Sequence, residues 1–434
     1  MLLIDASCRP GIVVDRRGGR RCLIEPGVAI LRSFLSQRSQ IGMSSSHVIR
    51  LKYGLNPHQQ PARLIQPAAA PLQVLNGAPG YINLLDALGA WRLVRELGAA
   101  TGKAAATCFK HVSPAGAAVA GAISPAFRAS QFLPDEPLSP VANAYVRARG
   151  GDRMCAFGDF AAVSEVVDDS LAQVLAREVS DGIIAPGYHP DAFARLAKKK
   201  GGAYLILQMD PDFEPPTLER RDVFGMQLEQ DCPSVPVTAA LFDNIVSRRR
   251  DVGPQVMETL IVATVALKYT QSNSVCVAWQ GQVVGMGAGQ QSRVHCTRLA
   301  CDKADKWFMA QHPRTLALRF KSQLRRPDFA NVVDGYLLWE QLSPPEREHL
   351  NSQLEETPES LTAAERDAWL AEYSGICLSS DAFLPFRDNV DRAHRSHVQV
   401  VAHAGGSNRD AEVIAAADAN DMVMLHTGMR WFVH

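Results

Sequence analysis

One order of apolar segments occurs twice in this chain, and it constrains the fold more than any other feature. Residues 157–208 begin with phenylalanine and aspartate and continue with a helix pattern, a buried strand, a second helix and a second strand. Residues 380–428 follow the same order at similar spacing. Alternating helices and short apolar strands are typical of an α/β fold. The repetition predicts a tandem duplication, and the competing interpretation is that α/β chains in general share this rhythm.

The duplication divides the chain into two predicted α/β/α lobes, residues 47–240 and 241–434. A charge-rich segment of the second lobe, about residues 310–375, contains the helix-start patterns Ser-Pro-Pro-Glu and Thr-Ala-Ala-Glu. We therefore predict a small helical insert there, without a chemical role. Residues 1–46 are arginine-rich and poorly periodic, and acidic residues interrupt them. We expect a poorly ordered extension rather than a targeting signal, because transit sequences are poor in acids.

Composition excludes several classes of function. The 45 basic and 45 acidic side chains cancel, so no net field would draw the chain to nucleic acid or to a membrane surface. No apolar run reaches the roughly 18 residues that a spanning helix needs. The nine cysteines are scattered, and Cys296 and Cys301 lack partners at zinc-like spacing. We expect reduced thiols, no structural metal, and a cytoplasmic location.

The stretch "FKHVSPAG" places two groups that can carry or move a proton side by side, Lys110 and His111. The apolar residues before them predict a short buried strand. Neighbours in a regular strand point to opposite faces, so the pair could not serve one substrate from within a strand. We expect Pro114 and Gly116 to end the strand and to let both side chains turn toward one pocket.

Three further stretches carry polar groups at predicted element ends. "KYTQSNSV" places Asn273 at a helix-to-strand junction, and "GMGAGQQSRVH" is glycine-rich and enters a helix at Arg293. The glycine run fits a dinucleotide fingerprint poorly, since no spaced acid follows, but a helix entry of this kind can bind an anion. In "SSDAFLPFRDNVDRA" an apolar wall from Phe383 precedes Asp388, which suggests a slot for a flat ring. The ending "GMRWFVH" is aromatic, so we expect a docked tail.

Many motifs in one order resemble a single family. "YGLNPHQ", "LNGAPGYINLLDA", "KHVSPAGAA", "RARGGDRMCAFGDF", "REVSDGIIAPGY", "KYTQSNSV", "GAGQQSRVHCTRLA" and "SSDAFLPFRDNVDRA" are similar to AICAR transformylase. That activity belongs to the carboxy-terminal part of the bifunctional AICAR transformylase/IMP cyclohydrolase. The resemblance covers about residues 47–434.

The resemblance implies a fold of two tandem cytidine-deaminase-like lobes, although the deaminase zinc signature is absent from this sequence. It implies transfer of a formyl group from 10-formyltetrahydrofolate, the cosubstrate, to the 5-amino group of AICAR, giving FAICAR in purine biosynthesis. It assigns His111 as proton acceptor, a task that suits a neutral imidazole. Lys110 would stabilise developing negative charge or protonate the departing folate nitrogen.

Other positions take their implied roles from the same resemblance. Those expected to bind AICAR are Lys52, Tyr53, Gly158, Asp181, Asn273, Arg293, Phe383 and Arg430. Those expected to contact folate are Val294, Asp388, Ser407 and Asn408. In some relatives a monovalent cation such as potassium binds, and Ser272, Ser274 and Asp381 stand where its ligands would be.

Some features depart from the family pattern. Lys52 replaces an arginine, which removes a bidentate phosphate grip and keeps the charge. His403 and Ala404 stand where relatives often carry proline, so the loop that follows is expected to sit differently.

The resemblance also implies a homodimer. Since no cyclohydrolase-like segment precedes residue 47, we expect no IMP cyclohydrolase activity and a separate enzyme for ring closure. The alternative function is a purine-nucleotide-binding protein without catalysis, and formylation from formate and ATP would need a phosphate loop that is lacking.

Overall fold

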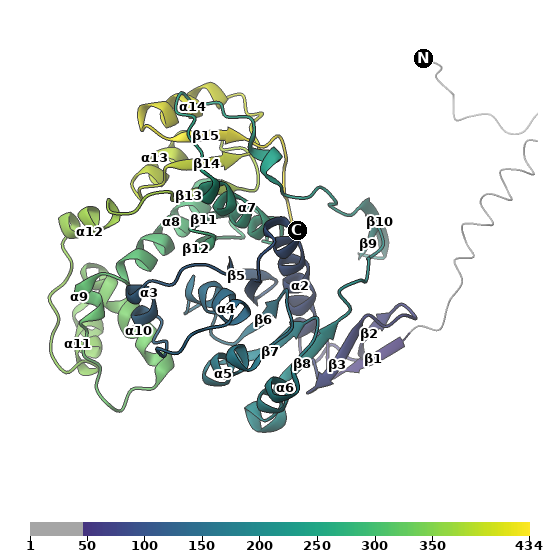
Figure 1. Ribbon diagram of the computed structural model, residues 1–434. Helices are drawn as coiled ribbons and strands as arrows, with labels where there is room; N and C mark the ends of the chain where they lie inside the picture. The colour runs from purple at the N-terminus through teal and green to yellow at the C-terminus, as the bar shows by residue number, and fades with distance from the viewer. Residues whose placement is uncertain (1–46) are drawn as a thin grey trace, which may run out of the picture.

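A computed structural model describes residues 47–434 of the chain, and the predicted extension over residues 1–46 lies outside the described residues. The strands of the central sheet from the first half are β3 (Leu72–Asn76), β4 (Ala105–Lys110), β5 (Ser113–Val119), β6 (Asp159–Val163), β7 (Ser180–Ala185) and β8 (Leu205–Met209). Those from the second half are β11 (Val275–Trp279), β12 (Gln282–Gly287), β13 (Cys377–Ser380), β14 (Val400–His403) and β15 (Val423–His426). Together they form one sheet of 11 strands in the order β15-β14-β13-β11-β12-β5-β4-β6-β7-β8-β3 (Figure 1).

Helices cover both faces of this sheet. One face packs against α2 (Tyr81–Thr101) and α7 (Pro254–Lys268). The other packs against α4 (Pro140–Gly150), α5 (Asp169–Arg177), α6 (Pro190–Ala197), α8 (Arg293–Met309), α13 (Asp388–His394) and α14 (Asp410–Ala419). Alternate residues of β4 enter the two cores, Ala105 and Phe109 on the α2 side and Ala106 and Cys108 on the other, as the pleat of a strand requires. The predicted α/β class is confirmed.

The two halves of the chain have the same order of elements. In each half a long helix (α2 or α7) precedes an antiparallel hairpin (β4–β5 or β11–β12) and a second helix (α4 or α8). Three parallel strands joined by helices follow, β6–β7–β8 in the first half and β13–β14–β15 in the second. The halves meet where β12 pairs with β5, at Gln282 and Ala118. This repeated topology agrees with a duplication, while the lobe boundary at residue 240 and the relation to cytidine deaminase stay predictions.

The segment predicted as a helical insert contains four short α-helices in the described chain. They are α9 (Pro313–Leu316), α10 (Arg326–Leu337), α11 (Pro344–Ser352) and α12 (Ala363–Leu370). Capping boxes of Ser343 with Glu346 and of Thr362 with Glu365 start α11 and α12, as the sequence pattern predicts. The remaining helical pieces are α3 (Pro125–Ser130) and 3₁₀ turns at Lys199–Gly202, Ala239–Phe242 and Trp339–Gln341.

Two hairpins stand apart from the central sheet. The first is β1 (His47–Leu51) with β2 (Ala62–Gln66), and the second is β9 (Leu218–Val223) with β10 (Met226–Asp231). The β9–β10 hairpin projects from the body (Figure 1). Val223 pairs with Met226 on one face of it, both side chains are exposed, and Phe224 at its turn is 97% exposed. The hairpin therefore presents uncovered apolar surface.

Close packing of β5 against α4 makes Gly116 a test of the fold. A methyl group on Gly116 would overlap the carbonyl oxygen of Ala148 in α4. The backbones of β5 and α4 cannot move apart without disturbing the packing around them. We therefore expect Gly116→Ala to lower the free energy of unfolding by roughly 1–3 kcal/mol. Urea unfolding checks this, with Gly253→Ala as control, since a methyl group there meets no atom within 4 Å in the described chain. Equal stability of the two variants would contradict the packing argument.

Candidate functional site

The topology brings nearly all of the predicted site residues to one edge of the central sheet. The carboxyl ends of the parallel strands β13, β14 and β15 reach this edge, and so does the amino end of β11, which is antiparallel to β13. Pairing through β12, β5, β4, β6 and β7 places the β4–β5 turn and the amino ends of β6 and β7 there as well. The predicted residues along this edge are Lys110, His111, Gly158, Asp181, Asn273, Arg293, Val294, Phe383, Asp388, Ser407, Asn408 and Arg430.

The turn between β4 and β5 contains His111 and follows directly after Lys110. Lys110 pairs with Ser113, and His111 and Val112 form a two-residue turn. Their φ angles are 51° and 61°, the positive values of the tight turns that join β-hairpins. A β-branched residue such as Val112 is sterically unfavourable there, so the surrounding structure must hold the turn.

The expectation that Pro114 and Gly116 end the strand was wrong. Both residues lie inside β5, and the chain reverses before them. Pro114 is opposite Phe109, beside a shift in the pairing register. A proline is tolerated at such an irregularity because it has no N–H to contribute to the ladder.

Asp86 of α2 fastens the turn. Its Oδ1 atom accepts a hydrogen bond of 2.7 Å from the main-chain N–H of Val112. Burial raises the pKa of Asp86, and the hydrogen bond from Val112 opposes that shift. A buried carboxylate thus compensates the unfavourable backbone at the position next to His111.

Lys110 and His111 both line one cavity of about 410 Å³. The Lys110 ammonium donates to the carbonyl oxygen of Phe157. A methyl group on the neighbouring Gly158 would lie 4.0 Å from Lys110 Nζ, so a longer side chain at position 158 would crowd the Lys110 ammonium. Asp181 is the second residue of β7, the strand next to β6. Its Oδ1 atom lies 2.5 Å from Lys200 Nζ.

Two other residues of the cavity, Lys303 and Cys155, were not recognised from the sequence. Lys303 Nζ lies 3.0 Å from Asp152 Oδ2 and 3.4 Å from Cys155 Sγ. Burial lowers the pKa of Lys303, but the charges of Asp152 and Cys155 and the hydrogen bonds to them together outweigh burial, and the pKa is raised. Lys303 is therefore a second cation beside Lys110 and His111. No sequence signal separates it from the solvated lysines of an amphipathic helix.

Arg293 is the centre of a buried polar cluster at the start of α8. Its guanidinium donates to Asp381 Oδ1, to Ser380 Oγ at 2.9 Å and to Asn273 Oδ1 at 2.6 Å. Asp381 is fully buried, and its Oδ2 accepts a 3.0 Å hydrogen bond from Ser274 N–H. Arg293 therefore joins the segment before β11 to the segment after β13.

The predicted cation ligands lie within this cluster. Ser272 Oγ accepts from the N–H of Val433 at 3.1 Å, and Ser274 Oγ is buried with no hydrogen-bond partner among the described residues. Hard cations bind hydroxyl and carboxylate oxygens, so the chemical type of these side chains suits a hard cation. The Asp381 charge is already paired with Arg293, so of the three predicted ligands only Ser274 has a side-chain oxygen without a hydrogen-bond partner within residues 47–434.

The remaining predicted residues follow the ends of the parallel strands. Phe383, after β13, is 43% exposed, and Asp388 Oδ1 accepts from Asn389 Nδ2 at 2.9 Å. Ser407 and Asn408 lie in the loop between β14 and α14. Arg430 lies over the ring of Phe432, 4.6 Å from its centroid. The next residue, Trp431, is buried, and its main-chain N–H donates to the carbonyl oxygen of Asp381 at 2.8 Å, which confirms the docked tail.

Lys52 and Tyr53 are not brought to this edge within one chain. They follow β1, in a two-stranded sheet separate from the central one. Figure 1 places this hairpin beside β3, at the opposite end of the sheet order from β15. Lys52 Nζ lies 5.9 Å from the centroid of the Tyr53 ring.

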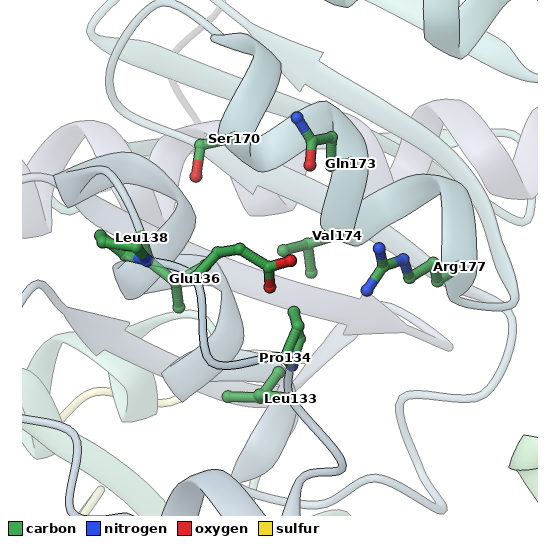
Figure 2. A pocket seen from close by; sticks show the side chains of 9 residues that line it. Leu133, Pro134, Glu136, Leu138, Ser170, Gln173, Val174 and Arg177 are labelled. Atoms are coloured by element: carbon green, nitrogen blue, oxygen red, sulfur yellow. The ribbon is translucent and has the colours of Figure 1, made fainter.

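A small hollow beside α5 has no part in the candidate site. Figure 2 shows it between α5 and residues 133–138, with the Glu136 carboxylate pointing toward the side chain of Arg177. Its volume is about 30 Å³, and its lining includes none of the predicted site residues. The space is too small for a substrate.

Residues 47–434 contain neither a membrane-spanning helix nor a cluster of metal-binding side chains. No helix there combines the length and apolar character needed to cross a bilayer. No group of three or more histidine, cysteine, aspartate or glutamate side chains in that range could hold a metal ion.

The fold and the site define a class: an α/β protein of two similar halves, with its polar groups gathered at one edge of a shared sheet. A model of the AICARFT/IMPCHase bienzyme family matches residues 28–303. The chain therefore belongs to the AICARFT/IMPCHase bienzyme family.

Several curated relatives are bifunctional purine biosynthesis proteins. The chain is 30% identical over 389 residues to the bifunctional purine biosynthesis protein PurH of Roseobacter denitrificans, covering 88% of this chain and 59% of the relative. It is 30% identical over 397 residues to PurH of Myxococcus xanthus, covering 88% and 60%. PurH of Sorangium cellulosum is 29% identical over 394 residues. The chain thus spans about three fifths of the length of these curated relatives.

Proposed function

We propose that this chain acts in purine biosynthesis by transferring the formyl group of 10-formyltetrahydrofolate to the 5-amino group of AICAR. The observation that carries the proposal is the β4–β5 turn, which lines one cavity with both Lys110 and His111. Membership of the AICARFT/IMPCHase bienzyme family supports this proposal, and the names of the PurH relatives support a role in purine biosynthesis.

The reaction needs a base and a stabiliser of negative charge. The AICAR amine is a weak nucleophile because its lone pair is delocalised into the ring and the carboxamide. In the proposed mechanism His111 takes a proton from the amine as its nitrogen bonds to the formyl carbon. The Lys110 ammonium stabilises the oxyanion of the tetrahedral intermediate. The bond from the formyl carbon to folate N10 then breaks, and N10 receives a proton, supplied by Lys110 or by the protonated His111.

The Arg293 cluster would hold the substrates in place for this step. Asn273, Arg293 and Phe383 would contact AICAR, with Gly158 and Asp181 beside the Lys110 turn. Val294, Asp388, Ser407 and Asn408 would contact the folate. A potassium ion near Ser274 would supply positive charge to the same cluster. In the sheet β11 and β4 are three strand positions apart, which is about 14 Å at the usual spacing between strands. Two bound substrates can span this distance.

A single assay tests the proposed function. Purified protein is mixed with AICAR and 10-formyltetrahydrofolate, and tetrahydrofolate formation is followed. Turnover that requires both compounds supports the formyltransferase. Tight binding of AICAR without any turnover would favour the alternative, a purine-nucleotide-binding protein without catalysis.

We also propose a homodimer. The exposed apolar face of the β9–β10 hairpin and the separation of Lys52 and Tyr53 from the remaining site residues both support association of two copies. An isolated two-stranded hairpin is marginally stable by itself, so a partner surface would stabilise it.

Mixed dimers test whether two subunits build one site. Chains carrying Lys110→Ala are exchanged with chains carrying Asp388→Ala. If the two residues reach one pocket from different subunits, a mixed dimer contains one intact site, and we expect part of the activity to return. Subunit exchange is verified separately by mass-tagged chains. No recovery after proven exchange would mean that both residues of a site come from one chain, and an active monomer on dilution would contradict the dimer.

A further inference from the structure

The imidazole of His403 lies where three loops of the candidate site meet. His403 ends β14 and is fully buried. Its Nδ1 atom accepts a hydrogen bond from the N–H of Leu384 at 3.3 Å and another from the N–H of Gly405 at 3.2 Å. One ring atom therefore holds the main chains of two separate loops.

Each of these loops carries residues assigned to substrate or folate. Leu384 follows Phe383 in the loop after β13, and Gly405 precedes Ser407 and Asn408 in the loop after β14. The carbonyl oxygen of His403 also accepts from the N–H of Thr427 at 2.8 Å, in the segment that leads from β15 to Arg430. In parallel sheets ligands bind outside the carboxyl ends of the strands, and His403 joins the loops at three such ends.

The bonding also fixes the form of the ring. Since Nδ1 accepts from two N–H groups, it carries no proton, and the neutral ring must be protonated at Nε2. Burial, with a smaller effect from His426, lowers the pKa of His403 to about 3. The ring stands edge-on to His426, with centroids 4.6 Å apart. Gly405, at φ 70°, passes so close to the His426 ring that a methyl group would collide with it.

We propose that His403 is a positioning residue for the folate cosubstrate. By accepting from Leu384 and Gly405 it fixes the Phe383 wall relative to the Ser407–Asn408 loop, and this spacing sets the affinity for the folate. The proposal rests on the proposed function. A buried acceptor with two donors is specific, because an apolar side chain of similar size leaves both N–H groups without a partner.

Two substitutions separate the acceptor from the bulk of the ring. His403→Leu keeps an apolar side chain and removes the acceptor, whereas His403→Asn places a carboxamide oxygen close to the position of Nδ1. We expect His403→Leu to raise the KM for 10-formyltetrahydrofolate about tenfold, the value of one to two neutral hydrogen bonds. The KM for AICAR should change less than twofold, and His403→Asn should restore most of the folate affinity.

Several outcomes would overturn the proposal. They are an unchanged folate KM in His403→Leu, an equal loss for AICAR and folate, and His403→Asn no better than His403→Leu. If His403→Leu does not fold, His403→Gln replaces it, since its oxygen lies one bond further out. The proposal then requires a raised folate KM in His403→Gln and not in His403→Asn.

Hydrogen exchange distinguishes failure of this proposal from failure of the proposed function. In His403→Leu the amides of Phe383, Leu384 and Phe386 and those of residues 404–408 should exchange faster together, while those of the β4–β5 turn stay at the wild-type rate. If the wild-type chain shows no formyl transfer, the proposed function fails and this coupled exchange still tests the positioning role. Independent exchange of the two loops would overturn it.

Discussion

Replacing His111 with alanine is expected to lower turnover by roughly 10²–10⁴-fold, the usual contribution of a positioned general base. The affinity for AICAR should change much less, because the other predicted nucleotide contacts are untouched. Steady-state kinetics give turnover, and calorimetry with AICAR alone gives binding. His349→Ala serves as the matched control, since that histidine is exposed in α11 of the helical insert.

The result also depends on the turn that holds His111. Val112 keeps its hydrogen bond to Asp86 in His111→Ala, so Lys110 should stay in place and a residual rate should remain. Turnover within twofold of the wild type would show that His111 is not the base. A loss of AICAR binding as large as the loss of turnover would instead indicate a collapsed turn.

Local pattern was sufficient to predict the layers of this fold. Strands such as β4 bury a continuous run of apolar residues, and helices such as α2 bury apolar residues at helical spacing. Both patterns can be recognised from residues that are close in the sequence. The repeated order of elements also predicted the helices and strands that recur in both halves. The joining of the halves through β12 and β5 depends on contacts between distant residues, and no local period encodes it.

The site was predicted less completely, and for a physical reason. The reversal at His111 and Val112 lacks the glycine or asparagine that usually marks positive φ, because Asp86, distant in sequence, holds it. Pro114 and Gly116 carried the usual turn signal and lie inside a strand. Lys303 lines the same cavity as Lys110 only because α8 packs against β12, which pairs with β5. The positions of side chains that tertiary contacts fix therefore cannot be predicted from neighbouring residues in the sequence.

Of the substitutions proposed in this protein, removal of the Arg293 side chain is expected to lower the free energy of unfolding the most. Arg293 is buried and is the ion-pair partner of Asp381, which has no exposed surface. Arg293→Met would leave a buried carboxylate without its counter-charge, and breaking such a pair from one side costs about 3–5 kcal/mol. Urea unfolding at neutral pH measures the change in the free energy of unfolding.

An exposed ion pair provides the control for this loss. Arg387 and Asp391 of α13 form a pair at 2.9 Å in which both side chains are at least one-third exposed. Arg387→Met should cost no more than about 0.5 kcal/mol, because solvent screens such pairs. Both variants remove one arginine from a salt bridge, so the difference between them reports burial of the pair.

The double variant Arg293→Met/Asp381→Leu separates the cost of an orphaned charge from the cost of lost contacts. If the unpaired carboxylate dominates, the double variant should be more stable than Arg293→Met, since replacing both partners removes the buried charge. If the hydrogen bonds to Asn273 and Ser380 dominate, removing Asp381 as well should give no recovery. Equal losses in Arg293→Met and Arg387→Met would contradict the view that this buried pair holds the segments before β11 and after β13 together.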